Sequence, residues 1–366
     1  MARIGIGIVG GGYMGKAHSA AFAAVGTVFE TRLKPRLAAI CGSTPQSGAR
    51  YAEAYGFDHA AEDWRALVAD PEVEAVVIAA PQATHREIAE AAFAAGKPVL
   101  CEKPMGLDLA EARAMVSAAE RAGVANMVAY NYSRTPATQY ARQLISQGEL
   151  GRLHHLRIQH TEDFHLASFL PPWRSQGAAN GCMGDLVPHP VNAALALGGP
   201  IAEVNAVMET VFPERNGVTV TNDDQVLMTL RFESGALGQL FASRVAAGSK
   251  MGYAYEVTGE KGAIRFDQED QNALWLYDCA APEAQSGFRR ILTGPAHPDY
   301  KPFCLGPGHG TGYQDQIIIE AKDFLTAIEG GAPVWPTFRD GLEVHRVIAA
   351  ARASAAVRNW VPVSDF

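Results

Sequence analysis

Three groups of residues along the chain have types and spacings that could carry chemistry. The first is Gly10-Gly11-Gly12-Tyr13-Met14-Gly15, which follows the apolar run from Ile4 to Val9. A G-x-G-x-x-G spacing between a strand and a helix is typical of a loop that binds a dinucleotide. Gly10 would allow the tight turn, Gly12 would let the backbone approach a pyrophosphate, and Gly15 would permit close packing of helix on strand. The N–H groups of the helix start would face the phosphates.

The second group is Glu102-Lys103-Pro104, which follows a short apolar run that ends at Cys101. Ligands bind in an open parallel sheet at the carboxyl ends of its strands. A lysine held there, with its backbone restricted by the following proline, would face the ligand crevice. The alternative is an ordinary surface lysine in a loop.

The third group contains Asp185 and His189, four residues apart in the segment from Gly181 to His189. Residues with this spacing share one face if the segment is helical, although Pro188 suggests only a first helical turn. A carboxylate can orient an imidazole and stabilise its charged form. The alternative is a helix cap next to a histidine with a purely structural role.

The residues that usually distinguish NAD-binding from NADP-binding chains do not indicate a preference here. An acidic residue at the end of the second strand would bind the adenine ribose and repel a 2′-phosphate. The sequence there is Ile40-Cys41-Gly42-Ser43-Thr44, with neither an acid nor an arginine. Ser43 and Thr44 could bind a 2′-phosphate or a ribose hydroxyl, or could simply form a turn and a helix cap.

The elements that position the first two groups alternate between strand and helix. Buried strands are expected at 4–9, 37–41, 73–80, 98–101 and 124–130, with helices at 16–24, 48–55, 85–95 and 109–122. This alternation predicts a parallel sheet with helices on both faces.

The pattern changes near residue 131. A helix is expected at 136–147, followed by strands at 153–159, 201–211, 224–232, 237–246, 253–258 and 263–266. Turn signals at 233–235 and 259–262 predict hairpins and therefore an antiparallel sheet. Residues 280–312 are rich in Gly and Pro and predict a long loop, and helices follow at 316–329 and 339–357. The predicted domains are 1–130 and 131–366, with a C-terminal helix able to pack back on the first domain.

Composition and charge exclude several classes of protein. The 366 residues carry a net charge of -8, with 48% hydrophobic and 19% charged residues, and no Lys/Arg block is present. These values argue against a disordered chain and a nucleic-acid-binding surface. The sequence has no unbroken apolar run of about 18 residues, so no membrane span is expected. Five Cys without a C-x-x-C pair predict neither a zinc site nor a disulfide framework, and free thiols suit the cytoplasm.

Other side chains were weighed as pocket residues or metal ligands. His154, His155, His160 and His165 lie close in sequence, but the first two point to opposite faces of a strand and no carboxylate or thiol set completes a cage, so no metal is expected. An aromatic ring can stack on the apolar face of a sugar while polar groups bind its hydroxyls. The candidate substrate residues of this kind are His160, Asp163, Trp173, Arg174 and Arg134. For Trp173, Arg174 and Arg134, an interface aromatic or an ion-paired arginine is an equal alternative.

The three groups, taken in order, resemble the glucose–fructose oxidoreductase/inositol dehydrogenase family. Pro81 and His85 match the family's Pro-x-x-x-His, and Asn131-Tyr132-Ser133-Arg134 is similar to its Asn-Tyr-Arg with Ser133 inserted. The chain departs from the family's Asp-x-Gly-x-His at Val187 and Pro188. Within the family, the pattern is most similar to that of sugar and cyclitol dehydrogenases.

The resemblance implies an α/β fold: an N-terminal Rossmann domain, and a C-terminal α+β domain with a large, mostly antiparallel open sheet. It implies NAD or NADP as cofactor. The residues implied in cofactor binding are Gly10, Gly12, Tyr13, Met14, Gly15, Ser43, Thr44, Pro81, His85, Glu102 and Lys103.

The implied activity is oxidation of a secondary hydroxyl on an inositol, a pyranose or an anhydro-sugar. Lys103 would bind the reacting hydroxyl, His189 would take its proton, and Asp185 would orient the substrate or His189. The alternatives within the family are a redox-neutral glycosidase that holds NAD tightly and a dinucleotide sensor without catalysis. A large open sheet also predicts a homodimer or homotetramer.

Overall fold

The computed structural model describes residues 2–166, 171–330 and 334–366. The chain divides into two compact units, the first made of Met1–Arg134 with Gly312–Leu342 and the second of Thr135–Thr311 with Glu343–Phe366. The break after Arg134 lies close to the boundary predicted at residue 130, and a return segment, Gly312–Leu342, also belongs to the first unit.

The first unit is built on a six-stranded sheet with the order β3-β2-β1-β4-β5-β6, in which every pair is parallel. Its strands are nearly continuous apolar runs because helices cover both faces. The five predicted strands are confirmed, whereas β3 has only two residues and gave no pattern. The strands are β1 (Ala2–Val9), β2 (Leu33–Cys41), β3 (His59–Ala60), β4 (Ala75–Ile78), β5 (Val99–Glu102) and β6 (Asn126–Ala129).

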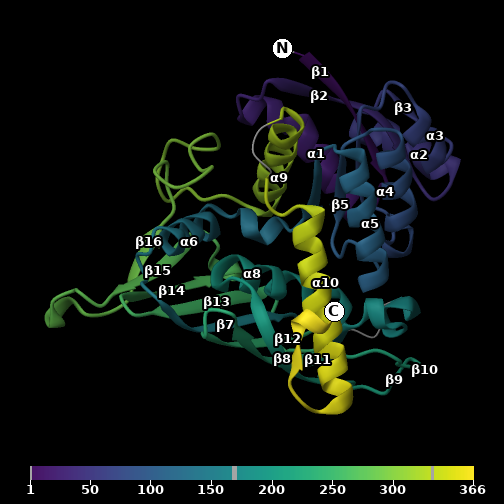
Figure 1. The fold of residues 1–366 in the computed structure, drawn as a ribbon. Helices are drawn as coiled ribbons and strands as arrows, with labels where there is room; N and C mark the ends of the chain where they lie inside the picture. Colours follow the sequence, from purple (N-terminus) through teal and green to yellow (C-terminus); the bar gives the residue numbers. More distant parts are fainter. Residues whose placement is uncertain (1, 167–170, 331–333) are drawn as a thin grey trace. The chain divides into compact units, whose positions relative to one another are not determined.

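Helices cover this sheet in two layers, with α1 on one side and α4 and α5 on the other (Figure 1). The four predicted helices are confirmed, and α3 was missed. Asp108 caps α5 by accepting a hydrogen bond from the Glu111 N–H, and Gly123 ends the helix in the left-handed conformation with φ 62°. The helices are α1 (Tyr13–Val28), α2 (Pro45–Tyr55), α3 (Trp64–Ala69), α4 (His85–Ala94) and α5 (Leu109–Ala122).

The return segment joins the first unit through α9 (Tyr313–Ile328), which lies beside α1 (Figure 1). Phe324 of α9 packs edge-on against Phe22 of α1, with ring centroids 6.4 Å apart. The side chain of Gln314 donates to the Ala17 carbonyl at 2.9 Å. The helix α10 (Phe338–Val357) starts in the first unit and continues into the second.

The second unit is built on a nine-stranded mixed sheet with the order β16-β15-β14-β13-β7-β12-β11-β8-β17. Every neighbouring pair is antiparallel except β7 with β12. The expected large, mostly antiparallel sheet is therefore confirmed. The strands are β7 (Leu153–Thr161), β8 (Ile201–Glu209), β11 (Gln225–Phe232), β12 (Leu237–Ser243), β13 (Gly252–Gly259), β14 (Gly262–Asp267), β15 (Ala273–Asp278), β16 (Arg289–Leu292) and β17 (Val361–Pro362), and a separate hairpin joins β9 (Glu214–Arg215) to β10 (Val218–Thr219).

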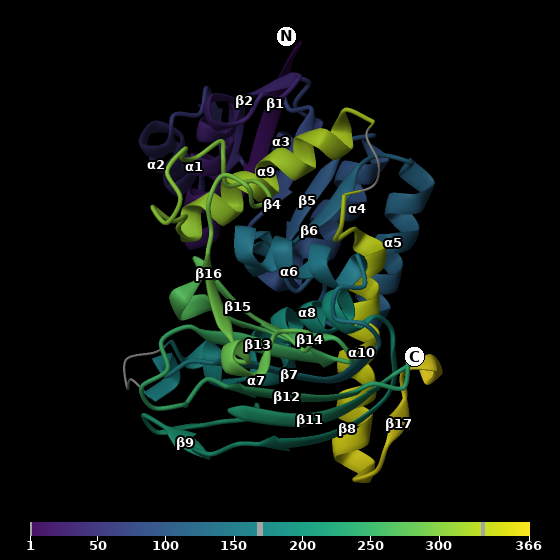
Figure 2. The same cartoon turned by 90° about the vertical axis from the view of Figure 1, so that its left-hand side faces the viewer.

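The helices α6 (Pro136–Ser146) and α8 (Pro188–Gly198) pack on one face of this sheet (Figure 2). The strands alternate accordingly, and in β11 Val226, Met228 and Leu230 are buried while Leu227 between them is exposed. Both predicted hairpins are confirmed, at 233–235 between β11 and β12 and at 259–262 between β13 and β14.

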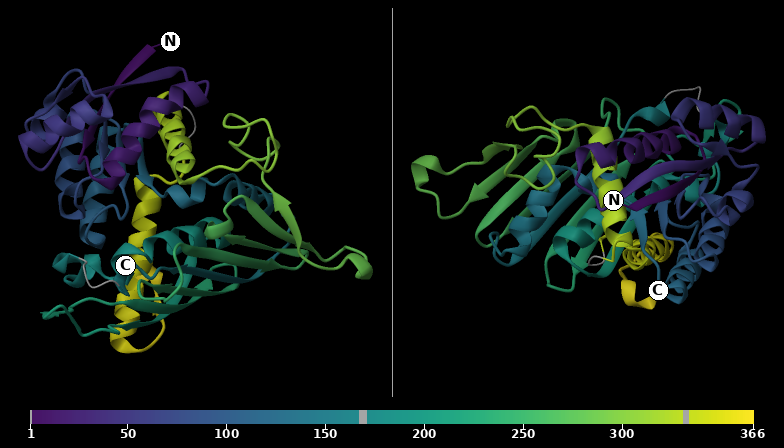
Figure 3. Two further views of the ribbon diagram at one scale, coloured as in Figure 1. Left: turned by 180° about the vertical axis from the view of Figure 1, so that it is seen from behind. Right: turned by 90° about the horizontal axis from the view of Figure 1, so that it is seen from above.

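One prediction for this unit is wrong. Residues 289–292, inside the expected loop 280–312, form the edge strand β16, and the β15–β16 hairpin extends from the sheet (Figure 3). The sequence Arg-Arg-Ile-Leu lacks the alternation of a half-buried strand, so its pairing with β15 could not be read locally. Over the described part of the chain, no helix combines the length and the hydropathy that crossing a bilayer requires.

Candidate active site

The glycine-rich loop between β1 and α1 has the geometry of a phosphate cradle. Gly10 has φ 97°, and a Cβ on it would lie 2.4 Å from the Ala79 carbonyl oxygen. A Cβ on Gly15 would lie 1.9 Å from the Gly10 oxygen, so only glycine permits this close packing. By contrast, a Cβ on Gly12 would meet no atom within 4 Å. Gly12 therefore borders open space at the start of the helix.

The N-terminus of α1 is open to an anion. No side chain caps it, and its first turn contains no acidic residue. Free N–H groups and the positive end of the helix dipole favour a phosphate at such a terminus. The loop thus fits the pyrophosphate of a dinucleotide.

An aromatic pair borders this loop. Tyr13, which is 73% exposed, stacks on Tyr313 with ring centroids 6.0 Å apart. The Tyr313 hydroxyl donates to the Met14 sulfur at 3.3 Å. Tyr313 begins α9, so the return segment contributes to the dinucleotide loop. Sequence reasoning missed Tyr313, because it lies nearly 300 residues from the glycine motif.

The end of β2 shows how Ser43 and Thr44 are used. Thr44 caps α2, since its hydroxyl accepts from the Ser47 N–H at 3.1 Å and its own N–H donates to the Ser47 hydroxyl at 3.0 Å. The helix-cap alternative for Thr44 is therefore realised. Ser43 is exposed, so its hydroxyl could contact a ribose hydroxyl or a 2′-phosphate at this strand end.

A carboxylate holds the loop of Lys103 from its N-terminal side. The Oε1 atom of Glu102 lies 2.7 Å from Nε2 of His18, and its Oε2 atom accepts from the Lys103 N–H at 3.2 Å. His18 is fully buried in α1, and Glu102 is buried at the end of β5. Glu102 therefore ties the lysine backbone to the helix that starts at the phosphate loop. His18 belongs to no sequence motif, and the only signal that could have found it is a histidine in the alanine-rich sequence of α1.

A second buried histidine holds the same loop from its other side. Nδ1 of His85 lies 3.2 Å from the Pro104 carbonyl, and Nε2 lies 2.9 Å from the Ala80 carbonyl. Burial lowers the pKa of His85, so a neutral ring serves one carbonyl as a donor. Pro81 precedes a single 3-10 turn and accepts from the Thr84 hydroxyl. His18 and His85, on opposite sides of Lys103, thus fix the loop that presents it.

Arg134 is committed inside the first unit. Its guanidinium lies 2.7 Å from Asp323 and donates to the Trp335 carbonyl at 2.8 Å, and the side chain is buried. These contacts favour the alternative of an ion-paired structural arginine over a substrate-binding role.

Asp185, Arg174 and Trp173 meet on the second unit. Nη1 of Arg174 lies 3.5 Å from Oδ2 of Asp185, and both side chains are about one-third exposed. The Arg174 guanidinium also lies 4.8 Å from the centroid of Trp173, which is 55% exposed. This group offers a charged donor, a charged acceptor and an aromatic face on one partly open surface.

The segment of Asp185 and His189 contains two helices. Asp185 ends α7 (Cys182–Asp185), and His189 lies in the first turn of α8, where Pro188 occupies the first position. His189 therefore lies in a first helical turn, as Pro188 suggested, and Asp185 does not share a helix with it, because proline lacks the N–H that would continue the helix from α7.

His160 packs against His189. Their ring centroids are 5.3 Å apart at 69°, and both residues are buried. The ring nitrogens of His160 lie 3.2 Å from the Leu186 carbonyl and 3.0 Å from the Glu162 carboxylate. These contacts place His160 as a support of His189 and of the turn before it.

The remaining candidates are engaged or buried. Asp163 accepts from Lys250 at 2.6 Å, and this hydrogen bond lowers the pKa of the Asp163 carboxyl. Burial raises the pKa of the Cys101 and Cys182 thiols, as expected of packing residues. No three His, Cys, Asp or Glu side chains among the described residues are placed to hold a metal ion.

Comparison with known proteins finds relatives over the whole chain. A model of the oxidoreductase family with an NAD-binding Rossmann fold matches residues 4–130, and a model of the GFO/IDH/MocA C-terminal domain matches residues 138–265. The chain is 36% identical to levoglucosan dehydrogenase of Pseudarthrobacter phenanthrenivorans over all of both chains. It is 27% identical to inositol 2-dehydrogenase of Rhizobium meliloti over 98% of each. A solved structure of levoglucosan dehydrogenase with NADH and L-sorbose superposes with a TM-score of 0.96 at 37% identity, covering 99% of each chain.

Proposed function

The chain belongs to the GFO/IDH/MocA family of NAD-binding oxidoreductases, and on that basis we propose that it oxidises a secondary hydroxyl of a cyclic sugar or cyclitol. The observation that carries the substrate class is the exposed group of Trp173, Arg174 and Asp185. An aromatic face suits the apolar C–H face of a pyranose or cyclitol ring. The guanidinium and carboxylate can donate to and accept from its hydroxyls.

The dinucleotide fits the first unit at the open N-terminus of α1. Gly10, Gly12 and Gly15 would hold its pyrophosphate, with Tyr13 and Met14 beside it and Ser43 near the adenine ribose. When bound, the dinucleotide supplies a hydride acceptor in its nicotinamide ring.

Lys103 and His189 divide the proton chemistry in this proposal. The Lys103 ammonium donates to the reacting oxygen and stabilises the negative charge that develops there. Nitrogen of the His189 imidazole takes the hydroxyl proton, as suits a histidine, whose ordinary pKa lies near neutrality. The C–H hydrogen leaves with its electron pair, so the secondary alcohol becomes a ketone. Asp185, held by Arg174, orients the substrate.

We further propose that a second copy of this chain covers the open face of the large sheet. Val207, Leu227 and Phe241 are paired in register across β8, β11 and β12 and are 61%, 54% and 37% exposed. An apolar row of this kind marks an association surface. Light scattering of the wild type should give a dimer or tetramer, and Leu227→Arg should lower the mass to that of a smaller species. The free cysteines agree with the proposed cytoplasmic location.

A screen for reduced nicotinamide tests the proposed activity. NAD and NADP are offered separately, each with inositols, pyranoses and anhydro-sugars, and absorbance of the reduced cofactor is followed. The proposal expects turnover with a few related epimers, whose pattern identifies the reactive hydroxyl. Binding of the dinucleotide without reduction across the whole panel would contradict it, and would favour the redox-neutral glycosidase or the sensor.

A further inference from the structure

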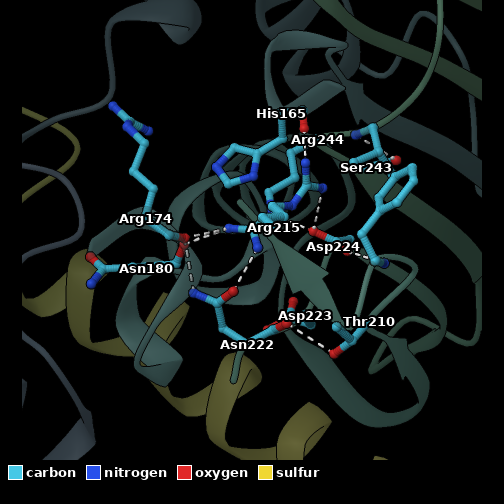
Figure 4. Close-up of polar contacts among 12 residues, drawn as sticks. His165, Arg174, Asn180, Thr210, Arg215, Asn222, Asp223, Asp224, Ser243 and Arg244 are labelled. Atoms are coloured by element: carbon cyan, nitrogen blue, oxygen red, sulfur yellow. Dashed lines mark hydrogen bonds and ion pairs between the residues drawn. The ribbon is translucent and has the colours of Figure 1, made fainter. Parts of the chain in front are cut away.

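A buried arginine lies beneath the exposed group of the second unit. Arg244 follows the last residue of β12 and is almost completely buried. Its guanidinium donates to the side chains of Asp224 at 3.0 Å and Asn222 at 2.6 Å, and to the carbonyls of Arg174 at 3.0 Å and Asn180 at 2.8 Å (Figure 4). All four acceptors converge on one planar fork, a geometry that lysine cannot reproduce.

Two of these acceptors belong to the segment that leads to Asp185. Asn222 reinforces the same bracket, since its amide donates to the Arg174 carbonyl at 3.1 Å and to the Gly177 carbonyl at 3.2 Å. The Arg174 carbonyl therefore receives hydrogen bonds from two buried side chains, Arg244 and Asn222.

The other end of the segment is held by Asp223, the residue after Asn222, just before β11. The Asp223 carboxylate accepts from the Met183 N–H at 2.6 Å, and its carbonyl accepts from the Cys182 N–H at 2.8 Å. A Cβ on Gly181 would lie 2.3 Å from the Asp223 carboxylate, so the segment runs directly against it. Residues 222–224 and Arg244 thus fix residues 174–183, which we name the anchored segment.

The Arg174 side chain leaves this cluster and extends away from it (Figure 4). Its backbone is fixed below, while its guanidinium meets Asp185 and the Trp173 ring. A buried ion pair adds little stability over apolar packing. The cluster fixes the backbone of Arg174, and so determines where its side chain meets Asp185 and Trp173.

We propose that Arg244 and Asn222 are positioning residues for sugar binding, which hold Arg174 so that it meets Asp185 and the substrate together. This inference rests on the proposed function of the Trp173, Arg174 and Asp185 group. The two buried residues act through Arg174 and do not touch the sugar themselves. Dinucleotide binding, which uses the first unit, is independent of them.

The test compares Asn222→Ala and Arg244→Lys with the wild type. Both should raise KM for the sugar about tenfold, because small displacements of a positioning group are costly. Turnover at saturation should stay within about threefold and the dinucleotide Kd within about twofold, since only ground-state contacts to the sugar are loosened. If Arg244→Lys does not fold, Asn222→Ala alone carries the test. A matched control is Thr210→Val, which removes a 2.9 Å hydrogen bond to the Asn222 carbonyl without touching Arg174.

A double-mutant cycle shows whether the effect passes through Arg174. In an Arg174→Ala background, Asn222→Ala should leave KM unchanged, because the group that it positions is gone. A KM increase that persists in that background, or an unchanged KM in the single variant, would overturn the proposal. Hydrogen exchange of residues 174–185 should accelerate in Asn222→Ala but not in Thr210→Val, and an unchanged rate would also overturn it. Because exchange needs no turnover, it separates failure of this inference from failure of the proposed function.

Discussion

The two units present their candidate catalytic residues by different physical means. In the first unit, Lys103 lies on a short loop at a strand end, held by one carboxylate and two buried histidines. In the second unit, Asp185 follows a segment without a strand, held by Arg244, Asn222 and Asp223. The parallel sheet supplies the geometry of the first site, so few side chains are needed to complete it. The segment before Asp185 is not paired in a sheet, so hydrogen bonds from buried polar side chains fix its backbone instead.

This difference predicts different vulnerabilities. Changes near Lys103 should affect the chemical step, because the loop carries the lysine that we propose acts in the transition state. Changes in the buried cluster of the second unit should affect sugar binding and stability, because that cluster supports the surface proposed to bind the sugar.

Removing the presented residues themselves should have the largest effect. Lys103→Ala and His189→Asn should each lower kcat by about 100-fold or more, since each removes charge stabilisation or general base catalysis. Lys97→Ala is the control, because Lys97 precedes the opposite end of the same strand and bonds to the Asp70 carbonyl. Steady-state rates with the preferred sugar measure all three, and near-normal turnover in either active-site variant would contradict the assigned roles.

Acid should weaken the second unit through His165. This residue is fully buried, and burial together with Arg244 and Arg215 lowers its pKa from 6.5 to about 3. Below about pH 6.5 the unfolded histidine binds a proton that the folded one does not, so stability falls as the pH drops toward about 3. Denaturant unfolding should show a loss of about 2 kcal/mol from this residue between about pH 7 and about pH 5.

His165→Leu should remove that part of the pH dependence, whereas His154→Gln, at an exposed position, should leave it intact. An equal slope in the wild type and His165→Leu would show that folding does not lower the pKa of His165, and would contradict this prediction.

The carboxylate of the first unit should show a smaller, kinetic effect. Glu102→Gln should lower kcat about tenfold, since it weakens a charge-assisted hydrogen bond to His18 worth about 2 kcal/mol. Glu111→Gln is the matched control, because the Glu111 carboxylate also accepts a backbone N–H, from Leu107 at 2.8 Å. If Glu102→Gln raised the sugar KM at constant kcat, the contrast between the two units would fail.

The smallest expected effect concerns the cofactor. Ser43→Asp should shift the ratio of kcat/KM for NAD over NADP about fivefold toward NAD, because a carboxylate at this strand end repels a 2′-phosphate. Ser43→Asn is the uncharged control and should shift this ratio less. An unchanged ratio in Ser43→Asp would place the adenine ribose away from Ser43.

The contrast between the units also explains what the sequence could predict. Gly10, Glu102 and Lys103 occur in short motifs at strand ends, where residue order along the chain already determines their positions. His18 meets Glu102 from 84 residues away, and Arg244 meets the Arg174 carbonyl from 70 residues away. Such partners are set by sheet order and helix packing, which periodicity does not reveal. For the same reason, the sequence could not predict that Arg134 pairs with Asp323 or that Asp163 pairs with Lys250.

In the proposed reaction, a hydride passes from a carbon of a cyclic sugar or cyclitol to the nicotinamide. The most direct measurement uses the preferred substrate carrying deuterium on the carbon of the reacting hydroxyl, with NAD and the wild-type protein. Mass spectrometry of the recovered nucleotide should find the deuterium in the reduced nicotinamide, in equal amount to the ketone formed. Deuterium that is lost to water, or that returns to a cleaved product without net cofactor reduction, would contradict the account.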